Sequence, residues 1–186
     1  MQNGIREILS PFSIIPVAVL QTQEQADLAC TNLLEKGIGV IEITLRTASA
    51  LDLIRYVSTR YGSNLIVGAG TVCSSERAEA AAKAGASFLV SPGQTEQLVN
   101  TMRNTGLPFL PGAISPTEIQ QSMERDLEVL KFFPAHVFGG VSALSAYASV
   151  FQGIDFIPTG GINEHSMSDY LALPNVLAVG GSWMLK

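Results

Sequence analysis

Two apolar runs of the chain carry charged residues that could do chemistry. Glu42 and Arg46 lie in VIEITLR, residues 40–46, and Lys131 lies in VLKFFP, residues 129–134. Both runs otherwise have the composition of buried strands, where an ion is costly unless it is paired or functional. A lysine in an apolar pocket is a common source of a neutral amine, which is the form that attacks a carbonyl carbon. Lys131 is therefore predicted to be a nucleophile.

Successive side chains of a strand point to opposite faces, so residues two positions apart share a face. Glu42 and Arg46 share one side of their strand with Thr44, and Lys131 shares a side with Phe133. The alternative to a reactive site is a buried structural ion network. Two cations and one anion would leave one cation unpaired, and a substrate carboxylate would complete the set.

Glycine pairs follow two later apolar runs. Gly160 and Gly161 lie in PTGGIN, and Gly181 follows another glycine in VGGSW, directly before Ser182. Glycine lets backbone N–H groups approach an anion closely, and a following helix N-terminus adds a favourable dipole. A tight turn without a ligand is the alternative for one pair. Two pairs after the last two strands of a barrel predict a phosphate site.

The elements that must position these residues alternate between strand and helix. Eight apolar runs have strand length: 14–19, 40–45, 65–71, 88–92, 108–112, 129–134, 155–160 and 176–182. Stretches with helical spacing separate them, among them 23–36, 48–61, 75–84, 95–105 and 143–150. We expect an α/β fold, a compact (β/α)8 TIM barrel with a short N-terminal helix. An open doubly wound sheet is the alternative.

The length of 186 residues favours a single domain over residues 1–186. The N-terminus lacks the features of a signal peptide, and the apolar runs are too short to span a bilayer, so we expect a cytoplasmic protein. The chain stops directly after its eighth strand, so the final helix of the barrel is expected to be absent. Either residues beyond Lys186 are missing, or the N-terminal helix and a neighbouring subunit cover that face.

Composition narrows the function further. The chain is 47% hydrophobic with 15% charged residues, which suits many buried strands, and its net charge of -5 argues against nucleic acid as a partner. Cys30 and Cys73 form neither a CxxC motif nor a disulfide framework, so both are expected to be free thiols. His136 and His165 have no partner at metal-ligand spacing. No metal site, no cofactor and no membrane partner are predicted.

A set of short motifs, in order along the chain, resembles the 2-keto-3-deoxy-6-phosphogluconate (KDPG) / 4-hydroxy-2-oxoglutarate (KHG) aldolase family. The motifs are EITLR (42–46), VGAGTV (67–72), SPG (91–93), LPG (110–112), KFFPA (131–135), PTGGI (158–162) and GGSW (180–183). The resemblance implies a compact barrel, a homotrimer and a class I aldolase that uses no metal. It implies cleavage of KDPG to pyruvate and glyceraldehyde 3-phosphate, and/or of KHG to pyruvate and glyoxylate.

Carried over by position, the resemblance also implies roles for individual residues. The partner is a small phosphorylated 2-keto acid. The implied roles are Lys131 as Schiff-base lysine, Glu42 as general acid/base, Arg46 and Thr71 as binders of the pyruvyl carboxylate, Pro92 and Phe133 as pocket walls, and Gly160, Gly161, Gly181 and Ser182 as the phosphate site.

Three alternatives stay open at this point. A galactonate-derived substrate would need the same chemistry and differs in one hydroxyl configuration. Another phosphate-binding barrel enzyme, such as an epimerase or a thiamine-phosphate-type synthase, would explain the glycine pairs but would not need Lys131 facing Glu42 and Arg46. A non-catalytic sugar-acid-binding or trimeric scaffold member would be expected to lose Lys131 or Glu42, and both are present. His136 departs from the family pattern, in which an acidic residue commonly follows FPA.

Overall fold

The computed structural model describes residues 4–185, which form eight parallel strands. Each one falls inside a strand segment expected from the sequence, so those eight predictions are confirmed. The strands are β1 (Ile14–Ala18), β2 (Val40–Thr44), β3 (Ile66–Gly70), β4 (Phe88–Val90), β5 (Phe109–Leu110), β6 (Val129–Phe132), β7 (Asp155–Pro158) and β8 (Val179–Gly181).

The strands close into a barrel. Six of them pair in the order β5-β4-β3-β2-β1-β8, and β6 pairs with β7. Single bridges join these two groups, Gly112 to Lys131 between β5 and β6 and Thr159 to Gly180 between β7 and β8. Every strand therefore has a neighbour on both sides, which excludes the open doubly wound sheet and confirms the (β/α)8 barrel.

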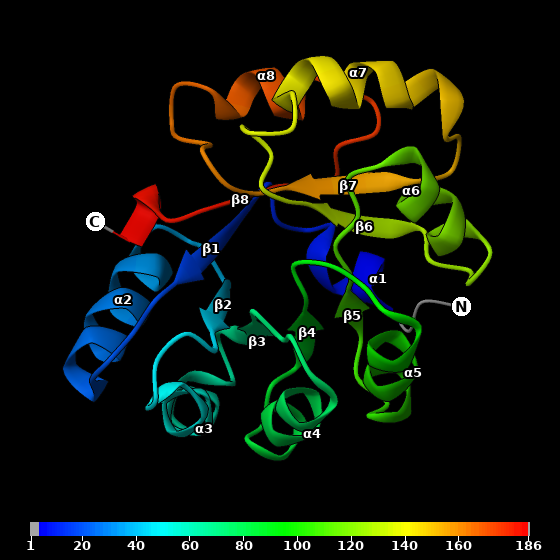
Figure 1. Ribbon diagram of the computed structural model, residues 1–186. Helices are drawn as coiled ribbons and strands as arrows, with labels where there is room; N and C mark the ends of the chain where they lie inside the picture. The colour runs from blue at the N-terminus through cyan, green and yellow to red at the C-terminus, as the bar shows by residue number, and fades with distance from the viewer. Residues whose placement is uncertain (1–3, 186) are drawn as a thin grey trace.

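Helices surround the strands in a ring from α2 to α8 (Figure 1). Side-chain caps start several of them: Ser74 accepts the N–H of Arg77 at α4, and Ser115 forms a capping box with Glu118 at α6. The helices are α1 (Ile5–Leu9), α2 (Gln23–Glu35), α3 (Ala50–Tyr61), α4 (Ser75–Lys83), α5 (Glu96–Asn104), α6 (Pro116–Met123), α7 (Gly140–Val150) and α8 (Met167–Leu171), with a 3-10 helix η1 (Trp183–Leu185). No helix among the described residues is long and apolar enough to cross a membrane.

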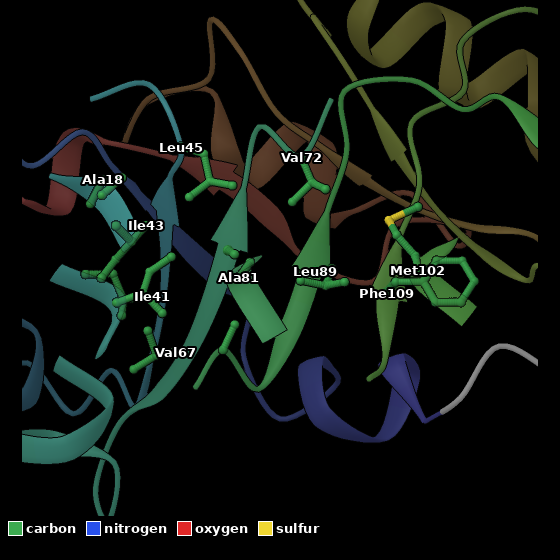
Figure 2. Close-up of a cluster of buried hydrophobic side chains, with 14 of the residues drawn as sticks. Ala18, Ile41, Ile43, Leu45, Val67, Val72, Ala81, Leu89, Met102 and Phe109 are labelled. Carbon is green, nitrogen blue, oxygen red and sulfur yellow. The ribbon is translucent and has the colours of Figure 1, made fainter. Parts of the chain in front are cut away.

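Alternation along the strands produces two separate apolar cores. The outward-facing residues Ile41, Val67 and Leu89 belong to the larger core between strands and helices, part of which Figure 2 shows. The inward-facing residues Val40 and Val129 belong to a smaller core inside the barrel. Glu42 and Lys131 also face inward, but they lie nearer the carboxyl ends of their strands than Val40 and Val129 do. They are therefore found between this inner core and the barrel mouth.

Helix α1 fills the end of the barrel at which the strands begin. Ile5 and Leu9 are fully buried in the inner core, and Arg6 of α1 forms an ion pair with Asp155 at the start of β7. One explanation drawn from the sequence required the N-terminal helix to cover the outer face beside β8. Because α1 lies inside the barrel, it does not cover that face. Within the described residues β8 is followed only by η1, whose Met184 carbonyl accepts a hydrogen bond of 3.0 Å from Lys36 Nζ.

Candidate active site

Glu42 and Lys131 meet inside the barrel, from β2 and β6. Lys131 Nζ lies 3.1 Å from Glu42 Oε1 and 3.4 Å from Oε2, and the two residues are 4% and 3% exposed, respectively. The two strands are on opposite sides of the barrel, so only its closure brings these inward-facing side chains together. The prediction of buried charges on a shared interior face holds for this pair.

The pair balances its own charge. An isolated buried ion is costly, and the opposite charge at hydrogen-bond distance offsets that cost because attraction is strong where water is excluded. Lys131 Nζ also lies 5.4 Å from the centroid of the Phe133 ring, an arrangement in which the ring face attracts a cation. A carboxylate this close to a lysine nucleophile can act as a general acid/base on a substrate bound to the amine.

Arg46 lies just past the end of its strand, as expected, but it is exposed, so the expectation that its charge is buried is wrong. Strand β2 ends at Thr44 and the chain turns there, so the guanidinium leaves the barrel interior. Its Nε donates a hydrogen bond of 3.1 Å to Thr71 Oγ1. Within residues 4–185 Arg46 makes no ion pair. The unpaired cation inferred from the sequence is real, but it stands in solvent contact at the barrel mouth.

Thr71 has an unusual backbone conformation. Its φ is 58°, in the left-handed region that a β-branched residue seldom adopts. The residue directly follows β3, and the next N–H, from Val72, donates to Val90 O at 3.0 Å. Such strain persists where the surrounding structure imposes it, and it is found most often at functional sites. Here it accompanies the hydroxyl that accepts the bond from Arg46.

A cavity of about 190 Å³ opens at the carboxyl ends of the strands. Six of the ten site residues expected from the sequence line it. Its walls are Val17, Val19, Arg46, Phe133, Thr159, Gly160, Gly161, Ile162, Gly181 and Ser182. Four expected site residues are not among the walls. Glu42 and Lys131 are buried beneath the cavity. Thr71 is connected to the cavity wall by its hydrogen bond with Arg46, and the carbonyl of Pro92 lies against Gly112.

Thr159 is a wall residue that the sequence interpretation did not single out. It is 6% exposed and has the inward parity of Ile157 in the inner core. A Cβ on Gly180, its bridge partner, would lie 2.3 Å from Thr159 Oγ1, so the glycine makes room for the hydroxyl. The signal was present in the sequence, since a polar residue precedes the Gly160–Gly161 pair at an inward position.

The two glycine loops form one side of the cavity. Gly160 and Gly161 have φ of 96° and 77°, which only glycine adopts without strain. The N–H groups of Gly161 and Ser182 donate to no other group within residues 4–185. The expected helix dipole behind Gly161 is wrong, because α8 begins only at Met167. An anion at this side of the cavity could therefore accept hydrogen bonds from these free loop N–H groups and from the Ser182 hydroxyl.

Other candidate groups lie elsewhere. Within the described part of the chain no group of three or more His, Cys, Asp or Glu side chains could hold a metal ion. His136 and His165 are exposed. Both cysteines are free: Cys73 is exposed, and burial raises the pKa of the Cys30 thiol to about 12, with the Asp27 carboxylate adding to the shift.

Comparison with known proteins gives a consistent result. The family model described as KDPG and KHG aldolase matches residues 5–186. The 2-dehydro-3-deoxy-phosphogluconate aldolase of Treponema pallidum is 40% identical over 181 residues, which is 97% of this chain and 86% of the relative. The KHG/KDPG aldolase of Escherichia coli K12 is 40% identical over 184 residues, 99% of this chain and 86% of the relative.

Solved structures agree in fold. KDPG aldolase from Legionella pneumophila, with pyruvate captured at low pH as a covalent carbinolamine intermediate, has a TM-score of 0.92 and 36% identity over 96% of this chain and 86% of its own. The enzyme of Zymomonas mobilis ZM4, with 3-phosphoglycerate, has a TM-score of 0.91 and 36% identity over 97% and 86%.

Together with these relatives, the buried lysine against a carboxylate in a (β/α)8 barrel identifies a class I aldolase, a carbon–carbon lyase that works through a Schiff base rather than a metal ion. The chain belongs to the KDPG and KHG aldolase family.

Proposed function

We propose that this protein cleaves KDPG to pyruvate and glyceraldehyde 3-phosphate, and KHG to pyruvate and glyoxylate, with Lys131 as the Schiff-base nucleophile. The observation that carries the proposal is the contact of 3.1 Å between Lys131 Nζ and Glu42 Oε1, beneath a cavity whose mouth holds Arg46. Within a family of aldolases, an amine and a proton-transfer group in contact supply the two functions that the reaction needs.

The first stage is formation of the iminium. Lys131 releases a proton to water, the neutral amine attacks the 2-keto carbon, and one proton moves from the nitrogen to the former keto oxygen to give a carbinolamine. The hydroxyl takes up the proton that was first released and leaves as water with the former keto oxygen, which gives an iminium that can accept an electron pair from the neighbouring carbon. The carbinolamine captured in the Legionella pneumophila relative is the intermediate expected at this stage.

The second stage breaks the carbon–carbon bond. Glu42 removes the proton of the C4 hydroxyl, the C3–C4 electron pair moves toward the iminium, and an aldehyde leaves. The resulting enamine takes a proton at C3 from Glu42, and water then hydrolyses the iminium to release pyruvate and restore Lys131. One carboxyl group thus serves as base and then as acid, which burial beside the reacting amine makes possible.

Substrate orientation falls to the cavity walls. Arg46 can hold the pyruvyl carboxylate with two parallel hydrogen bonds, and Thr71 Oγ1, 3.1 Å from Arg46 Nε, fixes the direction of the guanidinium. For the distal phosphate we propose the loop N–H group of Gly161 and the Ser182 residue, both of which line the cavity. The Zymomonas mobilis relative with 3-phosphoglycerate supports a phosphorylated substrate. Phe133 walls the pocket between the two ends.

The test is pyruvate release by the purified protein from three substrates. We expect turnover of KDPG and KHG that survives a metal chelator, with a higher kcat/KM for KDPG because of its phosphate. A galactonate-derived isomer differs at one hydroxyl and is the competing substrate. Faster cleavage of that isomer would reassign the substrate, and absence of cleavage of all three would overturn the proposal.

The homotrimer that the resemblance implies stays a prediction. It is supported by two apolar side chains on the loop after β6, Val137 at 70% and Phe138 at 49% exposure, since neighbouring apolar residues on a surface often mark an interface. Sedimentation velocity decides it, with three times the chain mass of 19.7 kDa expected and a monomer mass contradicting it.

A further inference from the structure

Gly70, the last residue of β3, leaves a space that the Glu42 side chain occupies. Strand register places Glu42 beside Gly68, so its side chain reaches one pleat further toward the barrel mouth to lie against Gly70. A Cβ added to Gly70 would lie 2.0 Å from Glu42 Oε1, 2.6 Å from Cγ and 2.7 Å from Cδ. Real Cβ contacts essentially never fall below 3.0 Å.

We propose that Gly70 is a positioning residue for proton transfer: its missing side chain is what allows the Glu42 carboxylate to reach Lys131 Nζ. The inference rests on the proposed function, in which Glu42 moves the protons of the reaction. Gly70 itself touches neither the amine nor the substrate in this scheme, and it acts only through Glu42.

The overlap cannot be removed by a small rotation. It includes Cγ and Cδ as well as Oε1, so turning the carboxylate about its last bond leaves two of the three collisions in place. Glu42 is 3% exposed, so its side chain has little free space nearby, and a shift of the whole side chain breaks the contact of 3.1 Å to Lys131. Gly70 does not have a positive φ, so alanine fits its backbone and Gly70→Ala tests the added methyl alone.

Gly68 offers a matched control in the same strand and on the same face. A Cβ there would lie 2.1 Å from Cζ of Phe88, which belongs to the inner core beneath the site. Gly68→Ala therefore introduces a comparable collision two residues away, without touching Glu42. It is expected to lower the melting temperature through overpacking.

The experiment separates Schiff-base formation from proton transfer. Exchange of the methyl protons of pyruvate with D2O, followed by NMR, needs both steps, whereas trapping with pyruvate and borohydride needs only the first. For Gly70→Ala we expect exchange to fall about 10²-fold, the range of a general acid/base, with trapping within about threefold of the parent. For Gly68→Ala we expect the parental ratio of exchange to trapping.

A double variant links the effect to Glu42. In the Glu42→Gln background, Gly70→Ala should slow exchange by less than about threefold, because both changes remove the same proton transfer. An unchanged ratio for Gly70→Ala, an equal loss for Gly68→Ala, or full additivity in the double variant would overturn the inference. Parental exchange in Glu42→Gln alone would instead refute the proposed role of Glu42.

Stability provides a second readout if Gly70→Ala folds poorly. Glu42→Ala removes the three atoms that the new methyl would meet, so Gly70→Ala should lower the melting temperature much less in that background than in the parent. Loss of the Lys131 partner is common to both Glu42→Ala proteins and cancels in the comparison. An equal decrease in both backgrounds would place the collision elsewhere and contradict the positioning role.

Discussion

Glu42 and Lys131 each make the burial of the other tolerable, and the same contact makes them reactive. Neither side chain has an alternative charged partner among the described ion pairs. Because Glu42 removes the C4 proton in the proposed scheme, its substitution should affect bond cleavage far more than attack by the amine. Substitution of single residues can therefore separate the two stages of the reaction.

Glu42→Gln is expected to retain Schiff-base formation with pyruvate and to slow cleavage of KDPG by about 10²-fold or more. The amide keeps the shape of the side chain and loses the base. Single-turnover cleavage and borohydride trapping measure the two stages separately. Cleavage at near the parental rate would transfer the proton-transfer role to another group or to water.

Ser182→Ala tests the phosphate side of the cavity without a collision. We expect KM for KDPG to rise about tenfold, the loss of one hydrogen bond to a charged group, while KM for KHG changes by less than about twofold. Ser182 is exposed, so the fold should be unaffected. Equal losses on both substrates would remove the support for this phosphate site. Gly161 is unsuited to the test, because a Cβ there would lie 2.4 Å from the His136 side chain.

At the scale of elements, the ends of strands decide what reaches the cavity. Apolar runs of strand length predicted every strand, because a strand in a barrel wall is covered on both faces and places apolar side chains on each. The same pattern could not show that β2 ends at Thr44, because Leu45 is buried as well and continues the apolar run past the turn. Arg46 was therefore expected to be buried like Glu42, and it is instead exposed at the barrel mouth, where it lines the cavity.

The contact between Lys131 and Glu42 was predictable only as a shared interior face, since the distance between two strands depends on barrel closure. Thr159 was missed because the Gly160–Gly161 pair was taken as the signal of the site, and the polar residue directly before it was given no weight. The position of α1 was also missed. The amphipathic start of the chain predicted a short helix, and only the three-dimensional structure shows that this helix plugs one end of the barrel and enters the inner core.

Leu9→Ala tests the role of α1 as that plug. Leu9 is fully buried, so the substitution leaves a cavity in the inner core and should lower the free energy of unfolding by about 2–5 kcal/mol. Urea denaturation measures the change. Leu28→Ala is the matched control, because Leu28 is 64% exposed on α2, and its effect should stay within about 0.5 kcal/mol. Similar small effects for both would show that α1 contributes little to the barrel.

At the scale of the whole molecule, a polar cluster joins α2 to α3. Asp27 accepts hydrogen bonds of 2.7 Å from Tyr61 and 2.9 Å from Tyr56, and Arg60 lies 3.4 Å away. The Tyr61 hydroxyl, more than any other group, holds the pKa of the Asp27 carboxyl below its ordinary value of 3.8. A pKa lowered by folding means that this stabilisation is present above the ordinary value and is lost as the pH falls through the folded value.

Asp27→Asn should therefore lower the urea midpoint at pH 7 and at pH 5, and the difference from the parent should shrink as the pH falls below about 3.8. Urea denaturation at a series of pH values measures this. Asp52→Asn is the control, because Asp52 is 81% exposed in its ion pair with Arg55 and should change the midpoint little. A difference that stays constant down to pH 2 would contradict the linkage.

The central claim is that Lys131 forms the covalent intermediate. Reduction with borohydride in the presence of pyruvate, followed by peptide mass spectrometry, is the most direct measurement of it. The account predicts a reduced pyruvyl group on the peptide that contains Lys131, loss of cleavage activity in step with labelling, and no label on the peptide that contains the α4 residue Lys83. A label on another lysine, or full activity after Lys131 has been modified, would contradict it.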